Sequence, residues 1–319
     1  SCHAEKQVAW KTTKHASAWA DLSANTSKAG YCEACHTVNN LGNAATDTAS
    51  GWRSTKDARF HDVQCESCHG AGLTHASAPN ATNRPLASIA ADTTATNGCG
   101  ECHSGTHNPF AREWKLSGHS QTWEASHNST DPYCQGCHTG QGALLTWQKG
   151  GNYVEKNSTA MLPATCAVCH DPHGNTGVDK QLRFPLNAAN LENNLCIKCH
   201  QRRGTIQDAI AQGRNSVHSP EGPTLLGQSG WFPPGMSVSD SLVATHGSST
   251  KNPKLCATCH VQKYSGTDPV TKQAVNSTGH RFLATPCVAA SGLPLDDQTN
   301  CQPANMTFRS CLASGCHGT

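Results

Sequence analysis

Residues 32–36 read Cys-Glu-Ala-Cys-His, and this spacing of two cysteines and a histidine recurs along the chain. Two residues separate the cysteines each time, and the histidine follows the second cysteine directly. Chance placement of 19 cysteines and 19 histidines in 319 residues predicts only about 0.07 such segments. Seven are present: Cys32/Cys35/His36, Cys65/Cys68/His69, Cys99/Cys102/His103, Cys134/Cys137/His138, Cys166/Cys169/His170, Cys196/Cys199/His200 and Cys256/Cys259/His260.

This spacing is the attachment motif of haem c. The two thiols add across the two vinyl groups of the haem, and the histidine binds the iron from one side. Zinc sites also use Cys-x-x-Cys pairs, but zinc does not require a histidine directly after the second cysteine every time. The sequence therefore predicts seven covalently attached haems from these segments.

The C-terminal segment predicts an eighth haem through a wider motif. Four residues separate Cys311 from Cys316, and His317 follows. An alternative pairs Cys301 with Cys316 across fourteen residues. The shorter loop closes at a lower entropic cost, which favours Cys311. Either choice gives eight haems of the c type.

Three cysteines then remain outside the motifs. Cys287 and Cys301 flank a loop that contains proline and aspartate, and a disulfide between them is expected in an oxidising compartment. Cys2 is left as an odd thiol, which either stays free or pairs between chains.

The second axial ligands of the irons are expected to be histidines as well. Eight of the 19 histidines follow motif cysteines, so 19 − 8 = 11 remain, whereas the chain has only three methionines. Haems with two histidine ligands are closed to substrate and lack the methionine ligand that raises the potential. The predicted second ligands are His15, His75, His107, His119, His173, His218, His246 and His280, which leaves His3, His61 and His127.

The composition argues against an ordinary apolar core. Hydrophobic residues make up 36% of the chain, aromatic residues 5%, and the mean hydropathy is −0.53. The haems themselves are therefore expected to form the core as a continuous chain. No apolar run is long enough for a membrane span, and a net charge of +2 implies no nucleic-acid partner. The absence of an apolar leader is expected of a mature, exported protein.

A repeat organises the predicted single domain, residues 1–319. A Trp-Lys pair, a histidine, a tryptophan and a tyrosine precede the first motif and recur about 104 residues later before the fourth motif. The repeat predicts a first part at residues 1–110 with haems 1–3 and a second at 111–215 with haems 4–6. A divergent C-terminal part, 216–319, holds haems 7 and 8. The recurring residues are Trp10, His15, Trp19 and Tyr31, and Trp114, His119, Trp123 and Tyr133.

The expected fold class is mostly irregular backbone with short α-helices. Helices are expected at 205–212 and in the turns that carry the motifs, and each His-x-x-x-Trp pair has the spacing of one helix face. The segments 76–98 and 227–241 are rich in turn residues and predict loops. No strand pattern persists.

These motifs, together with Cys-His-Asp-Pro-His-Gly at residues 169–174, resemble multihaem cytochromes of metal-reducing microbes. The closest in character are the extracellular cytochrome filaments, or nanowires, of the OmcS, OmcE and OmcZ type. The resemblance implies a continuous haem chain wrapped by loops, in a protein that is extracellular or on the cell surface. It also implies long-range electron transfer, with other copies of the chain, redox proteins or extracellular metal oxides as partners. In such filaments some distal ligands cross the subunit boundary, which makes His3 or His15 a candidate ligand for a neighbouring subunit.

Two other functions compete with the filament. One is a soluble periplasmic electron carrier. The other is an octahaem redox enzyme that acts on hydroxylamine, nitrite or tetrathionate. The reductases of that group carry a lysine in place of one motif histidine, whereas all eight motifs here end in histidine. Eleven further histidines also suffice to close all eight irons, so an electron carrier rather than an enzyme is expected.

Overall fold

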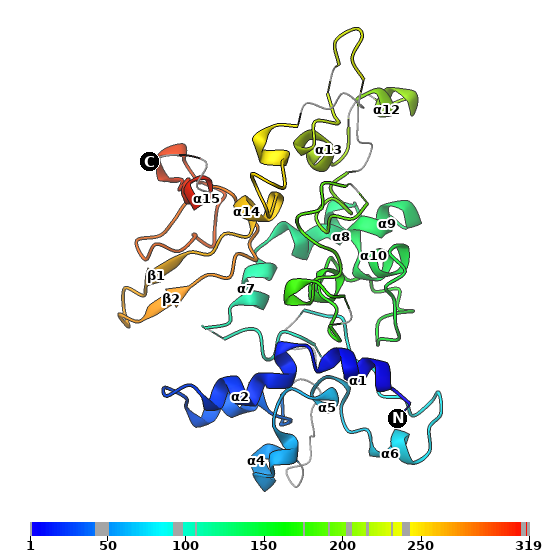
Figure 1. Ribbon diagram of the computed structural model, residues 1–319, viewed down its shortest axis with the longest axis vertical. Helices are drawn as coiled ribbons and strands as arrows, with labels where there is room; N and C mark the ends of the chain where they lie inside the picture. The colour runs from blue at the N-terminus through cyan, green and yellow to red at the C-terminus, as the bar shows by residue number, and fades with distance from the viewer. Residues whose placement is uncertain are drawn as a thin grey trace. The chain divides into compact units, whose positions relative to one another are not determined.

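Short helices joined by irregular backbone make up this protein (Figure 1). The computed structural model describes residues 2–41, 51–91, 98–105, 107–174, 176–190, 192–201, 206–214, 217–230, 232–237, 243–313 and 317. Within these ranges no α-helix exceeds seven residues. The predicted fold class is therefore confirmed, and no helix in these ranges is long and apolar enough to cross a membrane.

The chain divides into two compact units, residues 1–183 and 184–319. The first unit contains these elements in order: α1 (Ala4–Trp10), η1 (Lys14–Ser17), α2 (Ala18–Ser23), η2 (Gly30–Cys32), α3 (Glu33–His36), α4 (Trp52–Thr55), η3 (Ala58–Phe60), α5 (Cys65–His69), α6 (Leu73–Ser77), α7 (Phe110–Lys115), η4 (Gly118–Gln121), α8 (Thr122–Ala125), α9 (Pro132–His138), α10 (Gly140–Thr146), α11 (Cys166–Cys169) and η5 (Asp179–Gln181).

The second unit adds a small sheet to its short helices. Its elements are α12 (Ile206–Ala211), α13 (Glu221–Leu225), η7 (Thr245–Gly247), α14 (Cys256–His260), β1 (Ser265–Thr267), β2 (Ala274–Asn276), η8 (Pro303–Asn305) and α15 (Arg309–Ala313). Helix α12 confirms the helix expected at 205–212.

The expectation that no strand would form is wrong, because β1 and β2 pair as an antiparallel hairpin with Gly266 opposite Val275. The turn is fixed by the Asp268 carboxylate, which accepts the N–H groups of Val270 and Thr271 at 2.9 and 2.7 Å. This local turn chemistry stabilises strands too short to show an alternating sequence pattern.

The predicted disulfide between Cys287 and Cys301 is confirmed. It closes a loop in the second unit with a sequence separation of 14 residues. Because Cys301 is used in this bond, it is not free to pair with Cys316 in a haem motif. Cys311, in α15, is a free thiol and stays the predicted partner of Cys316, which lies outside the described residues.

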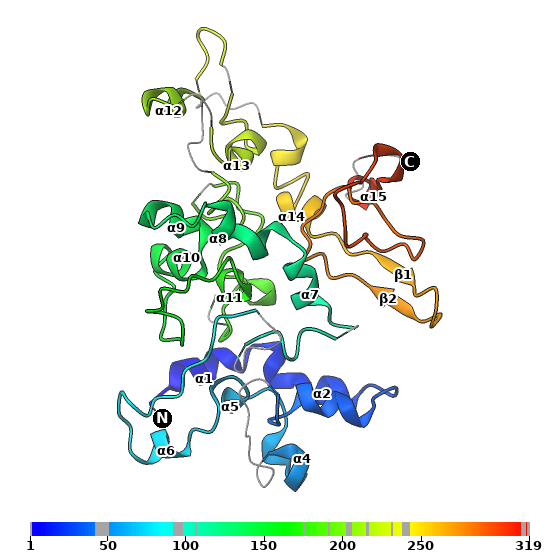
Figure 2. The same ribbon diagram turned by 180° about the vertical axis from the view of Figure 1, so that it is seen from behind.

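Apolar packing is sparse. One buried cluster in the first unit consists of Ile89, Leu144, Tyr153 and Ala167, with Leu162 packed against it. It joins α10 to α11, which lie side by side (Figure 2). So small a cluster is consistent with a chain whose interior depends on something other than aliphatic side chains.

Helices α9 and α10 are joined by a single residue, Thr139, which ends the first helix and caps the second. Asp131 caps α9 by accepting the N–H of Tyr133 at 2.9 Å, with Pro132 in the first helical turn. Thr139 ends α9 and caps α10 by accepting the N–H of Gly142 at 2.9 Å. A side chain at Gly142 would collide with the Gln135 carbonyl, so the sharp junction requires glycine there.

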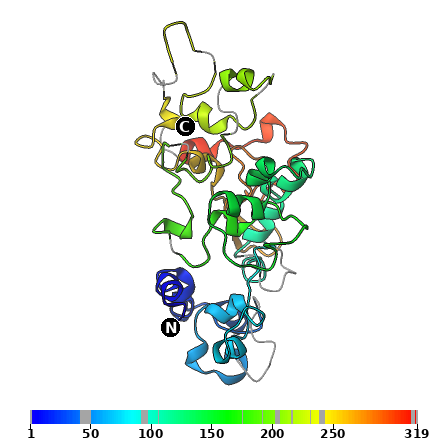
Figure 3. The ribbon, with the colours of Figure 1, turned by 90° about the vertical axis from the view of Figure 1, so that its right-hand side faces the viewer.

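The predicted continuous helix face for His15 and Trp19 is wrong, because the helix breaks between η1 and α2. The backbone N–H of Trp19 donates to the Asp62 carboxylate at 2.9 Å instead of to the carbonyl of His15. That carbonyl accepts the N–H of Val63 at 3.1 Å. Residues 62 and 63 therefore take the place of the two partners of one α-helical hydrogen bond, and the chain turns after α1. Figure 3 shows α1 in dark blue, viewed nearly along its axis. The second pair breaks likewise, with His119 in η4 and Trp123 in α8.

Equivalent hydrogen bonds occur in the two halves of the predicted repeat. The indole Nε1 of Trp10 donates to the Val63 carbonyl at 2.9 Å, and that of Trp114 donates to the Ala164 carbonyl at 2.8 Å. Each bond anchors the helix before a motif to the backbone just before a later one. These bonds support the repeat, while its exact boundaries stay a prediction.

Candidate haem-attachment sites

Most of the motifs fold as a single helical turn. Helices α5 and α14 coincide with whole motifs, α9 contains one, and α11 holds the two cysteines of another. Residues three apart on a helical turn lie on the same side, so the two thiols of a motif can reach one ligand together. The helices expected at the motifs 99–103 and 196–200 are wrong, because these segments form turns. Cys316 of the eighth motif lies outside the described residues.

The end of the sixth motif is held by a distant segment. The carbonyl of His200 accepts the N–H of Gly222 at 2.8 Å. Cys199 lies half-buried in this run of turns, whereas His200 is exposed. The Nδ1 of His200 lies 3.5 Å from the Glu221 carboxylate. The roles of Cys199 and His200 as haem ligands stay predictions.

The fourth motif agrees with the expected helical turn. Cys137 lies half-buried in α9, directly before His138, and is not part of a disulfide. Its thiol is thus retained for a thioether bond, and its attachment to haem stays a prediction.

Several motif histidines are oriented through one ring nitrogen. In four of them, Nδ1 lies 2.7–3.0 Å from a backbone carbonyl oxygen. Because a carbonyl can only accept, Nδ1 carries the proton and Nε2 keeps its lone pair for a metal, an arrangement common among metal-binding histidines. The four pairs are His36 with Ala18, His138 with Thr122, His170 with Lys180, and His260 with Phe282.

Three motif histidines face a second histidine across a similar gap. The ring centroids lie 6.2 Å apart for His103 and His15, 6.1 Å for His69 and His173, and 5.8 Å for His317 and His246. Two metal–nitrogen bonds of about 2.0 Å, plus about 1 Å from each nitrogen to its ring centre, require roughly 6 Å. The residues present therefore fit an iron held between two imidazoles.

Burial favours the neutral form of His15, His69 and His103, which is the form that binds a metal. Burial, followed by the nearby charges of His15 and His170, lowers the pKa of His103 to about 4. Burial also lowers the pKa of His15. The pKa of His69 is lowered by burial first, then by the charge of His173 and more weakly by that of His3.

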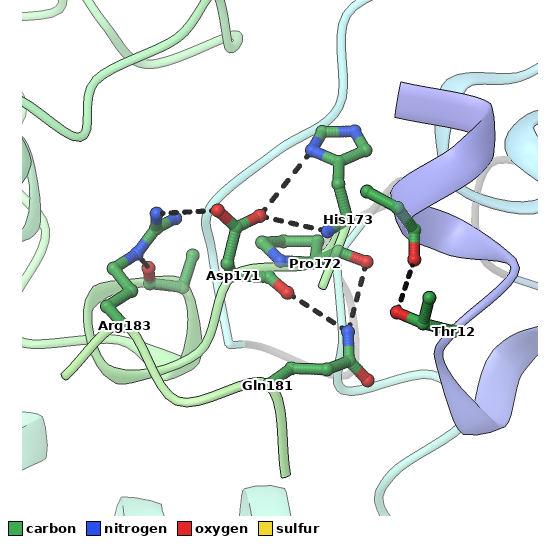
Figure 4. Close-up of polar contacts among 8 residues, drawn as sticks. Thr12, Asp171, Pro172, His173, Gln181 and Arg183 are labelled. Atoms are coloured by element: carbon green, nitrogen blue, oxygen red, sulfur yellow. Dashed lines mark hydrogen bonds and ion pairs between the residues drawn. The ribbon is translucent and has the colours of Figure 1, made fainter. Parts of the chain in front are cut away.

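The loop that carries His173 is held by a polar network (Figure 4). The Asp171 carboxylate accepts the backbone N–H of His173 at 3.0 Å and lies 3.3 Å from the Arg183 guanidinium. The Gln181 amide donates to the Asp171 and Pro172 carbonyls at 3.0 and 3.2 Å. Hydrogen bonding to the His173 side chain, with the further attraction of Arg183, lowers the pKa of Asp171 to about 2. This ionised carboxylate fixes the direction in which the His173 ring points.

Thiols of different motifs lie close enough for one to shift the pKa of the other. The pairs are Cys35 with Cys102 and Cys99 with Cys166 in the first unit, and Cys196 with Cys256 in the second. The attachment points of motifs 1, 3 and 5 therefore adjoin, and so do those of motifs 6 and 7. Sequence reasoning does not give this order, because it depends on how the loops cross.

The other predicted second ligands occupy different settings. His75 in α6 faces His3 with a ring separation of 6.4 Å, and His280 packs edge-on against Phe282 at 5.7 Å. His107 lies beside Gly105, His119 lies in η4, and His218 follows α12. The roles of these last three as second ligands stay predictions.

Three histidines outside the motifs have defined surroundings. His61 stacks on Trp19 with a centroid distance of 4.0 Å, and its buried Nε2 has no hydrogen-bond partner among the described atoms. His3 faces His75 of its own chain, and His15 faces His103. The expectation that His3 or His15 ligates a neighbouring subunit stays a prediction.

Comparison with known families agrees with these sites. Residues 161–205 match the doubled CXXCH motif family, and residues 1–70 match the family of cytochrome c554 and c-prime. This chain is a multihaem c-type cytochrome. The comparison with curated proteins gave no match for the cytochrome.

One solved structure is similar to the cytochrome, the crystal structure of outer cell wall cytochrome OcwA. The two share 20% identity with a TM-score of 0.44, over 86% of this cytochrome and 60% of that chain. This cytochrome thus spans about three fifths of the length of that protein.

Proposed function

We propose that this cytochrome transfers electrons through eight covalently attached haem c groups, each held between two histidines. The observation that carries the proposal is the approximately 6 Å separation of three motif histidines from a second histidine. When bound, haem supplies an iron that gains and loses one electron reversibly. The motif cysteines hold each haem, and the backbone carbonyls behind Nδ1 fix the motif histidines.

An electron carrier fits this arrangement better than an enzyme. A histidine on each side of an iron leaves no position for a substrate. The polar groups around His173 form a network that positions its ring and are engaged in bonds with one another. We therefore infer that the chain carries electrons and performs no chemistry on a small molecule.

The proximity of thiols from different motifs supports short transfers between haems. Haems attached at neighbouring cysteines would bring the edges of their macrocycles close together. In the first unit this links haem 3 to haems 1 and 5, and in the second unit it links haem 6 to haem 7. Transfer within the first unit would then follow an order different from that of the motifs along the sequence, whereas haems 6 and 7 of the second unit are consecutive.

The cytochrome is proposed to work outside the cytoplasm, as an extracellular filament of copies of itself that delivers electrons to redox proteins or metal oxides. The disulfide between Cys287 and Cys301 supports an oxidising compartment. Eight haems in 319 residues suit conduction along a path better than a single exchange. A head-to-tail contact that does not close generates such a filament.

Electron paramagnetic resonance of the oxidised native protein, combined with iron analysis, tests the haem assignment. Low-spin signals alone are expected from the motif haems. One high-spin haem per chain in the native protein would instead reveal an open iron and favour the octahaem enzymes.

The filament is tested separately by negative-stain microscopy and size exclusion of material sheared from cells. Filaments of the cytochrome are expected. A monomer that persists at high concentration would exclude the filament and leave a soluble periplasmic carrier.

A further inference from the structure

The N-terminal residues Cys2 and His3 have the features of a further haem site. The ring of His3 faces that of His75 at a centroid distance of 6.4 Å and an interplanar angle of 33°. The pair of His317 and His246 shows the same 33° angle at 5.8 Å. Each of the three pairs described above joins one motif histidine to one outside the motifs. If His3 is a motif histidine, the His3–His75 pair likewise joins one motif histidine to one histidine outside the motifs.

The sequence around His3 supports that role. Every other Cys-His dipeptide in the chain ends one of the eight predicted motifs. Cys2-His3 precedes Cys102-His103 by 100 residues. Each of these two dipeptides is followed by the repeat tryptophan, Trp10 or Trp114, and by a histidine five residues after it. Cys2-His3 therefore precedes Trp10 much as Cys102-His103, the end of the third motif, precedes Trp114.

Both rings are held in position by their own elements. His75 lies in α6, and its Nδ1 is 3.1 Å from the side-chain oxygen of Asn83, which leaves Nε2 for a metal. The Asn83 amide in turn donates to the Ala78 carbonyl at 2.8 Å. His3 precedes α1, and its carbonyl accepts the N–H of Gln7 at 3.1 Å. The other end of α1 is anchored by the Trp10 indole bond to the Val63 carbonyl.

A simple metal ion fits this place less well than a haem. Two imidazoles alone leave most positions of a divalent ion without protein ligands. Among the residues described, no group of three or more histidine, cysteine, aspartate or glutamate side chains is arranged to hold an ion. A haem iron needs only two axial ligands, because its porphyrin supplies the other four nitrogens.

We propose that Cys2 and His3 attach a ninth haem and that His75 is its second axial ligand. The proposal rests on the proposed function and extends it. The Cys2 sulfur bonds to one carbon of a haem vinyl group and the thiol hydrogen passes to the other carbon, so that no atom is lost and no oxidant is consumed.

Peptide mapping of the native holoprotein by mass spectrometry tests the attachment. The tryptic peptide that ends at Lys6 is expected to carry a haem, and the intact mass to correspond to nine haems per chain. A Lys6 peptide without haem and a mass of eight haems would overturn the proposal and leave the eight-haem assignment intact. Motif peptides without haem would instead overturn the proposed function itself.

The ligand pair is tested with His75→Ala and the matched control His127→Asn. The control alters a histidine outside the predicted ligands, at φ = 55°, where asparagine is tolerated. His75→Ala is expected to convert one haem per chain from low-spin to high-spin, while His127→Asn leaves the spectrum unchanged. An unchanged spectrum for His75→Ala would exclude His75 as a ligand.

Discussion

At the scale of the residue, the position of a ligand depends on backbone that packs behind it. His173 is directed by Asp171, and the next residue, Gly174, has φ = 74°. A side chain at Gly174 would fall on the Thr13 methyl group and lie 3.4 Å from the Ala9 carbonyl. Glycine is therefore needed at Gly174 both for its conformation and for the close approach of α1.

Gly174→Ala is expected to push the His173 loop away from α1 and from His69. The control Gly177→Ala has a similar φ of 67° but meets nothing within 4 Å. Gly174→Ala should lower the free energy of unfolding by about 1–3 kcal/mol more than the control, because only Gly174→Ala adds a steric clash. Thermal unfolding and the high-spin fraction check this. Equal effects of the two variants would mean that the contact with Thr13 does not matter.

At the scale of the element, the break between η1 and α2 depends on Asp62, whose φ is 70°. Asp62→Gly removes the carboxylate that accepts the Trp19 N–H but tolerates this conformation. It should cost about 1.5–3 kcal/mol of unfolding free energy. Asp62→Asn keeps an acceptor oxygen and should cost much less. Chemical denaturation measures the free energy of unfolding of both variants. A similar loss in the two would assign the effect to the charge of Asp62 rather than to its hydrogen bond.

The repeated tryptophan bonds give a second prediction for elements. Trp10→Phe and Trp114→Phe each remove one indole donor and should each lower the free energy of unfolding by about 0.5–1.5 kcal/mol. The smaller phenyl ring also packs less surface, which adds to each loss. The two losses should be similar because the bonds are equivalent in the repeat. Differential scanning calorimetry checks the pair, and a large effect of only one variant would contradict their equivalence.

At the scale of the whole molecule, the disulfide is expected to contribute to stability alongside the proposed haems. The double variant Cys287→Ala/Cys301→Ala opens a loop with a sequence separation of 14 residues. It should cost about 3 kcal/mol by the entropy of loop closure. The haem count should not change, because neither cysteine attaches haem. Mass spectrometry provides this control, and loss of a haem would return Cys301 to the eighth motif.

Haem removal should have a larger effect. The chain made in cells that cannot attach haem is expected to show little helix and no cooperative thermal transition, because the cluster around Leu144 is too small to offset chain entropy. Circular dichroism during heating measures both properties. A sharp transition in the haem-free chain would show that the polypeptide folds without its cofactors.

The sequence alone predicted the cofactor, the fold class and the disulfide, because covalent attachment requires fixed residues at fixed local spacing. Local spacing also located the helix at α12. It could not predict which histidines face each other or which thiols touch, because these contacts join segments far apart in the chain, as His15 does with His103. The broken helix at Trp19 was missed for the same reason, since Asp62 supplies the competing acceptor from 43 residues away. Tertiary structure decided these pairings, because a loop-rich chain with few apolar residues carries little periodic signal to specify them.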